Sequence, residues 1–291
     1  MDPILRGRVC IVTGANSGIG KAAATGLARR DATVVLACRR PAVGDDARRA
    51  MEDATGNQNL AVMPLDLASF ASVRRFAAEF TAKFLRLDVL VNNAGIYAAK
   101  RTVTEDGFER TWQVDYLSHF LLTHLLLDAL EAAAPSRVIN VSSEGHQIGR
   151  IDFEDLNRER RYRGMRAYGQ AKLAQILFTR EFARRFAGTG VSAYAMHPGG
   201  VRTDWSRGGR AMRLGALLAW PFMLTPEQGA DTVVWLASAP IEDGGNGKYF
   251  IKRRPAEPKA DANDPELARK LWDASEVLSG LRPAAGGGTP T

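Results

Sequence analysis

The chain has 291 residues, 45% of them hydrophobic, and a formal net charge of +7. This composition is that of a globular protein, and the length suits one large α/β domain or two small ones. No apolar run reaches the ~20 residues of a membrane-spanning helix. The start Met1-Asp2-Pro3 lacks the basic-then-apolar pattern of a signal peptide. These features argue against a membrane-spanning or secreted protein, and we expect a cytoplasmic one.

The positive charge lies in scattered pairs, such as Arg29-Arg30 and Arg253-Arg254, and in one denser run at 158–163 that includes Glu159. We interpret it as a solvated basic surface. Nucleic-acid binding is the weaker alternative, because no recognised nucleic-acid motif accompanies the charge. Anionic lipid or a phosphorylated cofactor is a more economical partner.

A strand, a glycine loop, a helix and a second strand open the chain. Residues 9–13 form a continuous apolar run, typical of a strand buried on both faces of a parallel sheet. Residues 21–30 predict a helix, and residues 33–38 a second strand. Between the first strand and the helix lies Gly14-Ala15-Asn16-Ser17-Gly18-Ile19-Gly20. Glycines there let phosphates approach the backbone, and the helix N-terminus offers them free N–H groups. A tight turn without ligand is the alternative, but this position favours a dinucleotide site.

Arg39 and Arg40 follow the second strand directly, and no carboxylate occurs before Asp45. At this point of a dinucleotide fold an acidic side chain bonds the ribose 2′-hydroxyl of NAD, whereas an arginine accommodates the 2′-phosphate of NADP. The sequence therefore favours NADP(H) over NAD(H). Two ordinary surface arginines are the alternative interpretation.

Three further strands alternate with helices in the middle of the chain. The first ends at Asp66-Leu67, the second runs into Asn92-Asn93-Ala94-Gly95, and the third ends at Ser142-Ser143. Amide side chains and small residues at the carboxyl end of a strand suit a ligand, although this tetrapeptide could also be a simple turn. The expected strands are 60–65, 88–91 and 137–141, and the expected helices are 69–84 and 109–134.

The long helical segment predicted at 109–134 has a broad leucine face, and its helices either pair with a second subunit or are buried against the sheet. Its His119 and His124 are five residues apart and do not share a face well, so we predict no metal site there. Cys10 and Cys38 both fall in predicted buried strands and are expected to be inert core residues rather than a disulfide or metal pair.

The second half begins with a loop, 144–166, that is longer than an ordinary connection and therefore suspect as functional. In the helix predicted at 167–185, Tyr168 and Lys172 are spaced i, i+4 and share one stretch of surface. A strand at 191–195 leads to His197-Pro198-Gly199-Gly200. The irregular segment 203–224 has tryptophans and leucines among arginines, which suits a lid over an apolar ligand or an amphipathic membrane-surface helix.

The C-terminal part of the sequence contains two helix-start signals. Thr225 and Pro226 begin a helix to Ala237, and Asp264-Pro265 begins the last helix, to about Leu278. A seventh strand is expected at 248–251, and the Gly- and Pro-rich tail 283–291 is expected to be disordered. No second-domain boundary is visible. We therefore predict one α/β domain at 1–282, with a Rossmann-like, doubly wound parallel sheet of about seven strands and helices on both faces.

Three motifs in order resemble the short-chain dehydrogenases/reductases: Thr13-Gly14-x-x-x-Gly18-Ile19-Gly20, Asn92-Asn93-Ala94-Gly95 and Ser143…Tyr168-x-x-x-Lys172. The likeness runs from about Arg6 to Leu281. Further phrases are similar to the retinol-dehydrogenase-like branch of that family: Leu36-Ala37-Cys38-Arg39, Arg161-Tyr162-Arg163-Gly164, Leu177-Phe178-Thr179-Arg180-Glu181 and Gly247-Lys248-Tyr249-Phe250. The resemblance implies NADP(H)-linked interconversion of lipophilic alcohols with aldehydes or ketones. A homodimer or homotetramer is an open expectation.

The resemblance also assigns roles. Tyr168 donates the proton in reduction and is the base in oxidation. A free tyrosine titrates near ~10, and the positive charge of Lys172 favours the phenolate. Lys172 is also expected to bond the nicotinamide ribose. Ser143 is expected to hold the substrate oxygen, with Ser142 as the alternate. The remaining implied cofactor contacts are Gly14, Asn16, Ser17, Gly18, Ile19, Gly20, Arg39, Arg40, Asp66, Leu67, Asn93, Ala94, Gly95, Pro198, Gly199, Val201 and Thr203.

One residue departs from the family pattern. Asp115 stands where the family has an asparagine that supports a helix distortion and a water connecting the catalytic lysine to solvent. Aspartate keeps the size and the acceptor oxygens but loses the amide donors and can add a charge. Asp115 is therefore a further candidate catalytic residue. It also leaves open an alternative function, that of a catalytically impaired, cofactor-binding protein of the same fold.

Overall fold

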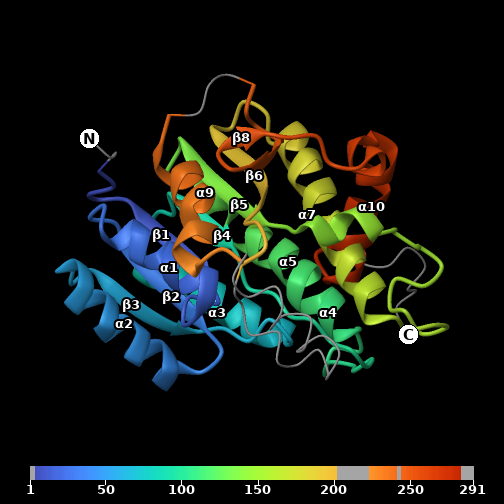
Figure 1. Ribbon diagram of the computed structural model, residues 1–291, viewed down its shortest axis with the longest axis horizontal. Coiled ribbons are helices and arrows are strands. Elements are labelled where there is room, and N and C mark those ends of the chain that lie inside the picture. Colours follow the sequence, from blue (N-terminus) through green and yellow to red (C-terminus); the bar gives the residue numbers. More distant parts are fainter. Residues whose placement is uncertain (1–3, 202–222, 241–243, 283–291) are drawn as a thin grey trace, which may run out of the picture.

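The computed structural model describes residues 4–201, 223–240 and 244–282. Its centre is an eight-stranded sheet in the order β3-β2-β1-β4-β5-β6-β7-β8, with helices packed on both faces (Figure 1). This order places β1 beside β4, so the chain crosses over after β3 and winds in the opposite direction. The predicted doubly wound α/β fold is confirmed. The predicted tail 283–291 and most of the segment 203–224 lie outside the described residues.

Seven parallel strands carry the sheet, and each matches a predicted strand to within two residues. The eighth strand, which was not predicted, has two residues and pairs antiparallel with β7. Lys252 and Arg253, with φ of 50° and 62°, form the two-residue turn between β7 and β8. The strands are β1 Val9–Thr13, β2 Thr33–Cys38, β3 Leu60–Pro64, β4 Val89–Asn92, β5 Ser136–Val141, β6 Val191–His197, β7 Tyr249–Ile251 and β8 Arg254–Pro255.

Alternate residues of the parallel strands point into two separate cores. Cys10 and Val12 of β1 face the core under α1 (Gly18–Ala28), α2 (Pro41–Thr55) and α9 (Pro226–Ser238). Val9 and Ile11 face the core under α3 (Phe70–Lys83), α5 (Ser118–Leu125) and α7 (Gly164–Arg185). Because both faces are buried, the strands need continuous apolar runs rather than alternating ones.

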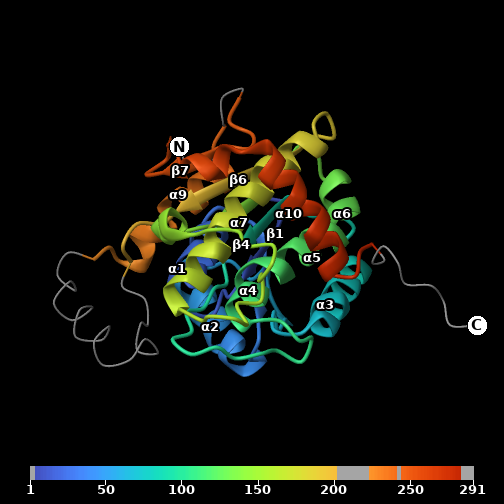
Figure 2. The ribbon, with the colours of Figure 1, turned by 90° about the vertical axis from the view of Figure 1, so that its right-hand side faces the viewer.

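The last helix, α10 (Pro265–Leu278), lies on the outer side of α7 (Figure 2). Trp272 of α10 packs among the rings of Phe120, Phe178 and Phe182. The expected helix starts at Thr225-Pro226 and Asp264-Pro265 are confirmed, and both cap residues accept hydrogen bonds from the first turn. In the described part of the chain, no helix is both long and apolar enough to cross a bilayer.

Helix α2 is absent from the sequence-based prediction, although Pro41 at its first position and Gly56 in the left-handed region at its end are ordinary helix signals. Its apolar stripe is thin, since its buried residues are Gly44, Ala47 and Met51. A pattern search for apolar periodicity therefore finds little there.

The long helical segment predicted at 109–134 is helical but is not one continuous helix. The segment is divided into α4 (Arg110–Trp112), a π-turn at Gln113–Leu117, α5 and α6 (Leu127–Glu131). The π-turn inserts an extra residue into the helical repeat. The leucine face of the helical segment is buried within the chain's own core, which was one of the two expected alternatives. Asp115 lies in the π-turn, so the distortion sets where this side chain points.

Candidate active site

The glycine loop between β1 and α1 requires glycine at positions 14, 18 and 20. Gly14 and Gly18 have φ of 68° and 52°. A Cβ on Gly20 would lie 2.4 Å from the Gly14 carbonyl oxygen and 2.5 Å from Asn93 Nδ2. Ser17, the N-cap residue of α1, makes no side-chain capping bond. The loop therefore presents backbone N–H groups at a helix N-terminus, which fits the phosphates of a dinucleotide.

Thr13 at the end of β1 ties this loop to the turn after β4. Its Oγ1 accepts hydrogen bonds from the backbone N–H groups of Asn93 and Ala94, both at 2.9 Å. Asn93 Nδ2 donates to the Thr13 carbonyl oxygen at 2.8 Å, and His119 Nε2 lies 3.0 Å from Thr13 Oγ1. Burial lowers the pKa of His119 to about 3, so its ring is neutral. Neither Thr13 nor His119 was predicted as a site residue, because their meeting depends on tertiary packing.

Residues at the ends of the next two strands lie at the same edge of the sheet. Arg39 and Arg40 follow β2, are exposed, and form no ion pair with any described residue. Asp66 follows β3, where its Oδ1 accepts from Ala68 N–H at 2.9 Å, and Leu67 beside it is buried. The carboxyl ends of parallel strands are where doubly wound folds bind their ligands.

Ser143 and Tyr168 border one small space beside Gly145. A Cβ on Gly145 would lie 2.8 Å from Tyr168 Cε1 and 3.7 Å from Ser143 Oγ. Ser142, the alternate candidate, is buried, and its hydroxyl donates to the Lys172 carbonyl oxygen at 2.7 Å. Ser143 Oγ instead accepts from Gly145 N–H at 3.2 Å and keeps its own hydrogen available. The geometry thus favours Ser143 as the residue that meets a ligand.

Lys172 lies one helical turn beyond Tyr168, and its Nζ is 5.4 Å from the centre of the Tyr168 ring. The ammonium donates to the Val141 carbonyl oxygen at 3.0 Å and to Gln175 Oε1 at 3.2 Å. Asp115 Oδ2 is its third oxygen neighbour, at 3.5 Å. We call these three oxygens the ammonium cage.

Asp115 is fully buried, and its other oxygen, Oδ1, accepts from Ile96 N–H at 2.7 Å. Burial raises the pKa of Asp115 to about 6, although the charge of Lys172 and the Ile96 hydrogen bond pull it down. Gly95 packs over the pair, since a Cβ there would lie 3.0 Å from Asp115 Oδ2 and 3.3 Å from Lys172 Nζ. A larger residue at this position would press on both charged groups.

The segment after β6 approaches the same region through Pro198, Gly199 and Val201. Gly199 has φ of 85°, and a Cβ on it would lie 2.5 Å from Leu224 Cδ1. Val201 is buried and forms a parallel bridge with Leu224. Thr203, the last expected cofactor contact, lies outside the described residues.

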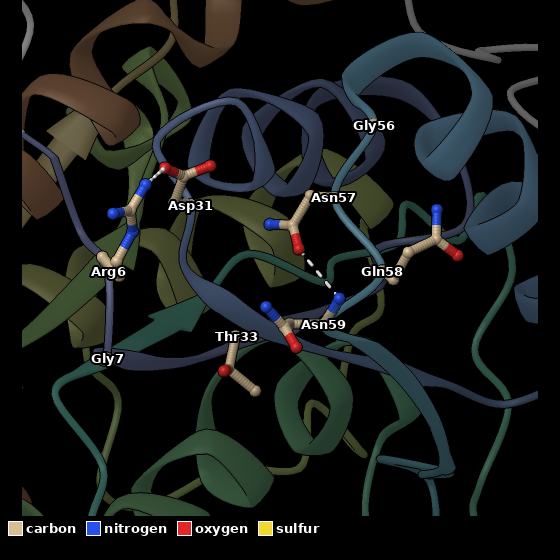
Figure 3. A pocket seen from close by; sticks show the side chains of 8 residues that line it. All are labelled: Arg6, Gly7, Asp31, Thr33, Gly56, Asn57, Gln58 and Asn59. Carbon is tan, nitrogen blue, oxygen red and sulfur yellow. Dashed lines mark hydrogen bonds and ion pairs between the residues drawn. The ribbon is translucent and has the colours of Figure 1, made fainter.

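A hollow of about 420 Å³ lies at the opposite end of the sheet, lined by residues just before β1 and β3 and by residues before and at the start of β2 (Figure 3). Several of its polar groups are used internally: Arg6 pairs with Asp31, and Asn57 Oδ1 accepts from Asn59 N–H. Because this hollow is at the amino ends of the strands, we do not regard it as the active site. Among residues 4–201, 223–240 and 244–282, no three His, Cys, Asp or Glu side chains gather as metal ligands would.

The chain is similar to known proteins along most of its length. A family model described as short chain dehydrogenase matches residues 8–213. Mouse (Mus musculus) retinol dehydrogenase 14 is 44% identical over 296 residues, covering 96% of this chain and 88% of the relative. Human (Homo sapiens) retinol dehydrogenase 11 is 45% identical over 277 residues, covering 95% of this chain and 87% of the relative.

Two solved structures show the same arrangement. An uncharacterised protein from Mycobacterium paratuberculosis has 36% identity and a TM-score of 0.79, with 96% of each chain covered. The RhlG/NADP active-site complex of Pseudomonas aeruginosa has 28% identity and a TM-score of 0.68, covering 86% of this chain and 97% of the other. The similarity therefore spans most of the chain.

Proposed function

Since the chain belongs to the short-chain dehydrogenase family, in its retinol-dehydrogenase-like branch, we propose that it is an NADP(H)-dependent oxidoreductase. In this proposal it interconverts a lipophilic alcohol and the corresponding aldehyde or ketone. The observation that carries it is the meeting of Ser143 and Tyr168 around Gly145, with Lys172 Nζ 5.4 Å from the centre of the Tyr168 ring. These groups are a proton donor, a cation near it and a hydroxyl that can hold an oxygen.

A nicotinamide cofactor, when bound, would supply the hydride in reduction and accept it in oxidation. As a carbonyl oxygen gains negative charge, the hydroxyl of Tyr168 donates its proton to that oxygen, and in oxidation the Tyr168 phenolate takes the proton back. Ser143 donates its hydroxyl hydrogen to the same oxygen and fixes its position. Lys172 supplies the positive charge that favours the phenolate.

The cofactor would be held by the backbone of the glycine loop, Gly14 to Gly20, and by the turn Asn93 to Gly95. Arg39, with Arg40 in support, would pair with the 2′-phosphate of NADP(H). Both are exposed at the end of β2 with no described carboxylate paired to them. The similar Pseudomonas aeruginosa structure is itself a complex with NADP. Asp66 and Leu67 are proposed adenine contacts, and Pro198, Gly199, Val201 and Thr203 are proposed nicotinamide contacts.

A lipophilic substrate fits the segment that follows Ser143. Ile148 and Met165 are 53% and 39% exposed there, although both are apolar. The ring of Tyr97 meets that of Tyr168 edge-on, with 6.4 Å between the ring centres. The relatives named above are retinol dehydrogenases, whose alcohol is apolar. A cytoplasmic location and a homodimer or homotetramer remain predictions.

A turnover screen of aldehydes, ketones and retinoids with NADPH and NADH tests the proposal. Tyr168→Phe removes only the hydroxyl, so we expect turnover to fall by about 10²–10⁴-fold while NADPH binding is nearly unchanged. Lys172→Met is expected to damage both turnover and cofactor binding. A Tyr168→Phe protein with most of the wild-type rate would show that the proton donor is another group.

The second candidate function is a cofactor-binding protein with little turnover. The buried Asp115 carboxylate beside Lys172 favours it, since this charge opposes that of the lysine. A wild-type protein that binds NADPH tightly, turns over nothing in the screen and gains activity many-fold as Asp115→Asn would support this function over the enzyme.

A further inference from the structure

The ammonium of Lys172 donates two of its hydrogens inside the protein and faces a carboxylate oxygen on a third side. Two are donated to Val141 O and Gln175 Oε1, and the third direction is occupied by Asp115 Oδ2, at 3.5 Å. The Lys172 side chain is 4% exposed and that of Asp115 is fully buried. In this low-dielectric place the ion pair is little weakened by solvent.

The two oxygens of Asp115 have different surroundings. Oδ1 accepts the Ile96 N–H, whereas Oδ2 is buried and has no hydrogen-bond partner among the described residues. A neutral amide could accept from Ile96 just as well through its oxygen. The hydrogen bond therefore does not require a carboxylate, and what the carboxylate adds is a negative charge facing Lys172.

Among the described residues, the other titratable groups near Asp115 do not supply the negative charge that faces Lys172. Glu109 faces it from the start of α4, but its two oxygens cap that helix by accepting from Thr111 and Trp112 N–H. His119 faces it from α5 through the Asp115 carbonyl oxygen, and burial keeps this histidine neutral at ordinary pH. Among the described groups that act on Asp115, Lys172 on α7 is the cation.

We propose that Asp115 is a positioning residue whose charge opposes that of Lys172 and so raises the pH at which Tyr168 becomes a base. This inference rests on the proposed function of Tyr168. When Asp115 is protonated, the field of Lys172 acts fully on the phenol. When Asp115 is ionised, part of that field is cancelled, and the phenolate forms only at higher pH. Because burial holds the pKa of Asp115 at about 6, the opposing charge is present at neutral pH.

The test is the pH dependence of alcohol oxidation at saturating NADP⁺ for the wild type and Asp115→Asn. Asparagine keeps the Ile96 hydrogen bond and removes the charge. We expect the rising limb of the Asn variant to lie about one pH unit lower, the low end of what one nearby charge produces. At a pH on that limb, this shift equals about a tenfold higher rate. Superimposable limbs would overturn the proposal.

Gln175→Leu is the matched control. It removes a neutral oxygen from the same ammonium cage, so it disturbs the position of Lys172 without changing the charge. We expect a lower rate but an unchanged midpoint of the rising limb. A midpoint that moves as far in Gln175→Leu as in Asp115→Asn would assign the effect to the geometry of Lys172 and would refute a charge effect.

A second readout needs no turnover. The ultraviolet absorbance of tyrosinate is titrated in the wild type and in Asp115→Asn, and the matching Tyr168→Phe protein is subtracted from each. The difference reports Tyr168 alone, and we expect it to ionise at lower pH in the Asn variant. If this shift occurs while no alcohol or carbonyl is turned over, the proposed enzyme function fails and the electrostatic role of Asp115 stands. If the two titrations coincide, the role of Asp115 fails whatever the activity.

Discussion

Replacing Thr13 by valine tests the junction between the fold and the cofactor site. Valine has nearly the same shape as threonine, so the change removes one hydroxyl at a fully buried position and leaves the packing of β1 intact. That hydroxyl joins the glycine loop, the turn after β4 and His119. We expect Thr13→Val to destabilise the protein and to weaken cofactor binding together.

The size of the effect follows from which groups lose a partner. Asn93 N–H keeps a second acceptor, the Val91 carbonyl oxygen at 3.0 Å, so it is not orphaned. Ala94 N–H and His119 Nε2 do lose their partner, at 2.9 and 3.0 Å. Each buried group left unpaired costs about 1–3 kcal/mol, and Ala94 is half-buried, so we expect a total of about 2–4 kcal/mol.

Urea unfolding followed by tryptophan fluorescence measures this loss, and fluorescence titration of NADPH measures the binding. We expect NADPH to bind about fivefold more weakly, equivalent to about 1 kcal/mol spent on ordering the turn. Thr25→Val is the matched control, because its hydroxyl donates to the Lys21 carbonyl oxygen one turn back on α1. A Thr13→Val protein within about 0.5 kcal/mol of this control would refute the reasoning.

Four other changes have defined outcomes. Asp88 is buried, but hydrogen bonds from Arg86 and Arg8 outweigh burial and lower its pKa. The stability that its ionised form contributes is therefore present above the ordinary pKa of an aspartate and is lost as the pH falls below it. Asp88→Asn should therefore lower the free energy of unfolding at neutral pH by about 2–3 kcal/mol, and by progressively less in acid. This loss is smaller than for a fully buried pair, because both arginines are about 40% exposed. Asp115→Asn should raise the melting temperature above pH 7 but not near pH 4. Burial raises the pKa of Asp115, so the stability that its protonated form contributes is lost as the pH rises through about 6. Arg39→Ala should weaken NADPH by the equivalent of roughly 1.5–3 kcal/mol and leave NADH unchanged, and equal affinities of the wild type for the two cofactors would contradict the NADP assignment. Turnover should rise along a homologous aldehyde series, since each buried methylene contributes about 0.8 kcal/mol, and a flat series would argue against an apolar pocket near 144–166.

Local patterns in the sequence predicted most of the architecture. Continuous apolar runs located seven strands, and cap signals such as Thr225-Pro226 located helix starts to the residue. The patterns failed where the structure is set by tertiary contacts or is too short to have a period. Helix α2 buries few residues, β8 has two, and the π-turn at Gln113–Leu117 breaks a helix whose sequence looks continuous.

The candidate site divides in the same way. Motif spacing brought Tyr168 and Lys172 onto one helix surface, and Ser143 was expected at the end of the neighbouring strand. The ammonium cage was not predictable, because Val141 contributes a backbone carbonyl and Gln175 became relevant only once α7 was packed on β5. The link from His119 to Thr13 joins positions 106 residues apart and depends on the placement of α5 under β1.

The two outer strands of the sheet bear on how copies of this chain can assemble. The edge strand β3 ends in Pro64, and β8 at the other edge ends in Pro255. Proline has no N–H to donate, and natural sheets use it on edge strands to block pairing with another sheet. The short β8, turned antiparallel by its hairpin, also offers little length for an added strand. A dimer or tetramer of this protein should therefore form through helix surfaces, with each sheet remaining separate.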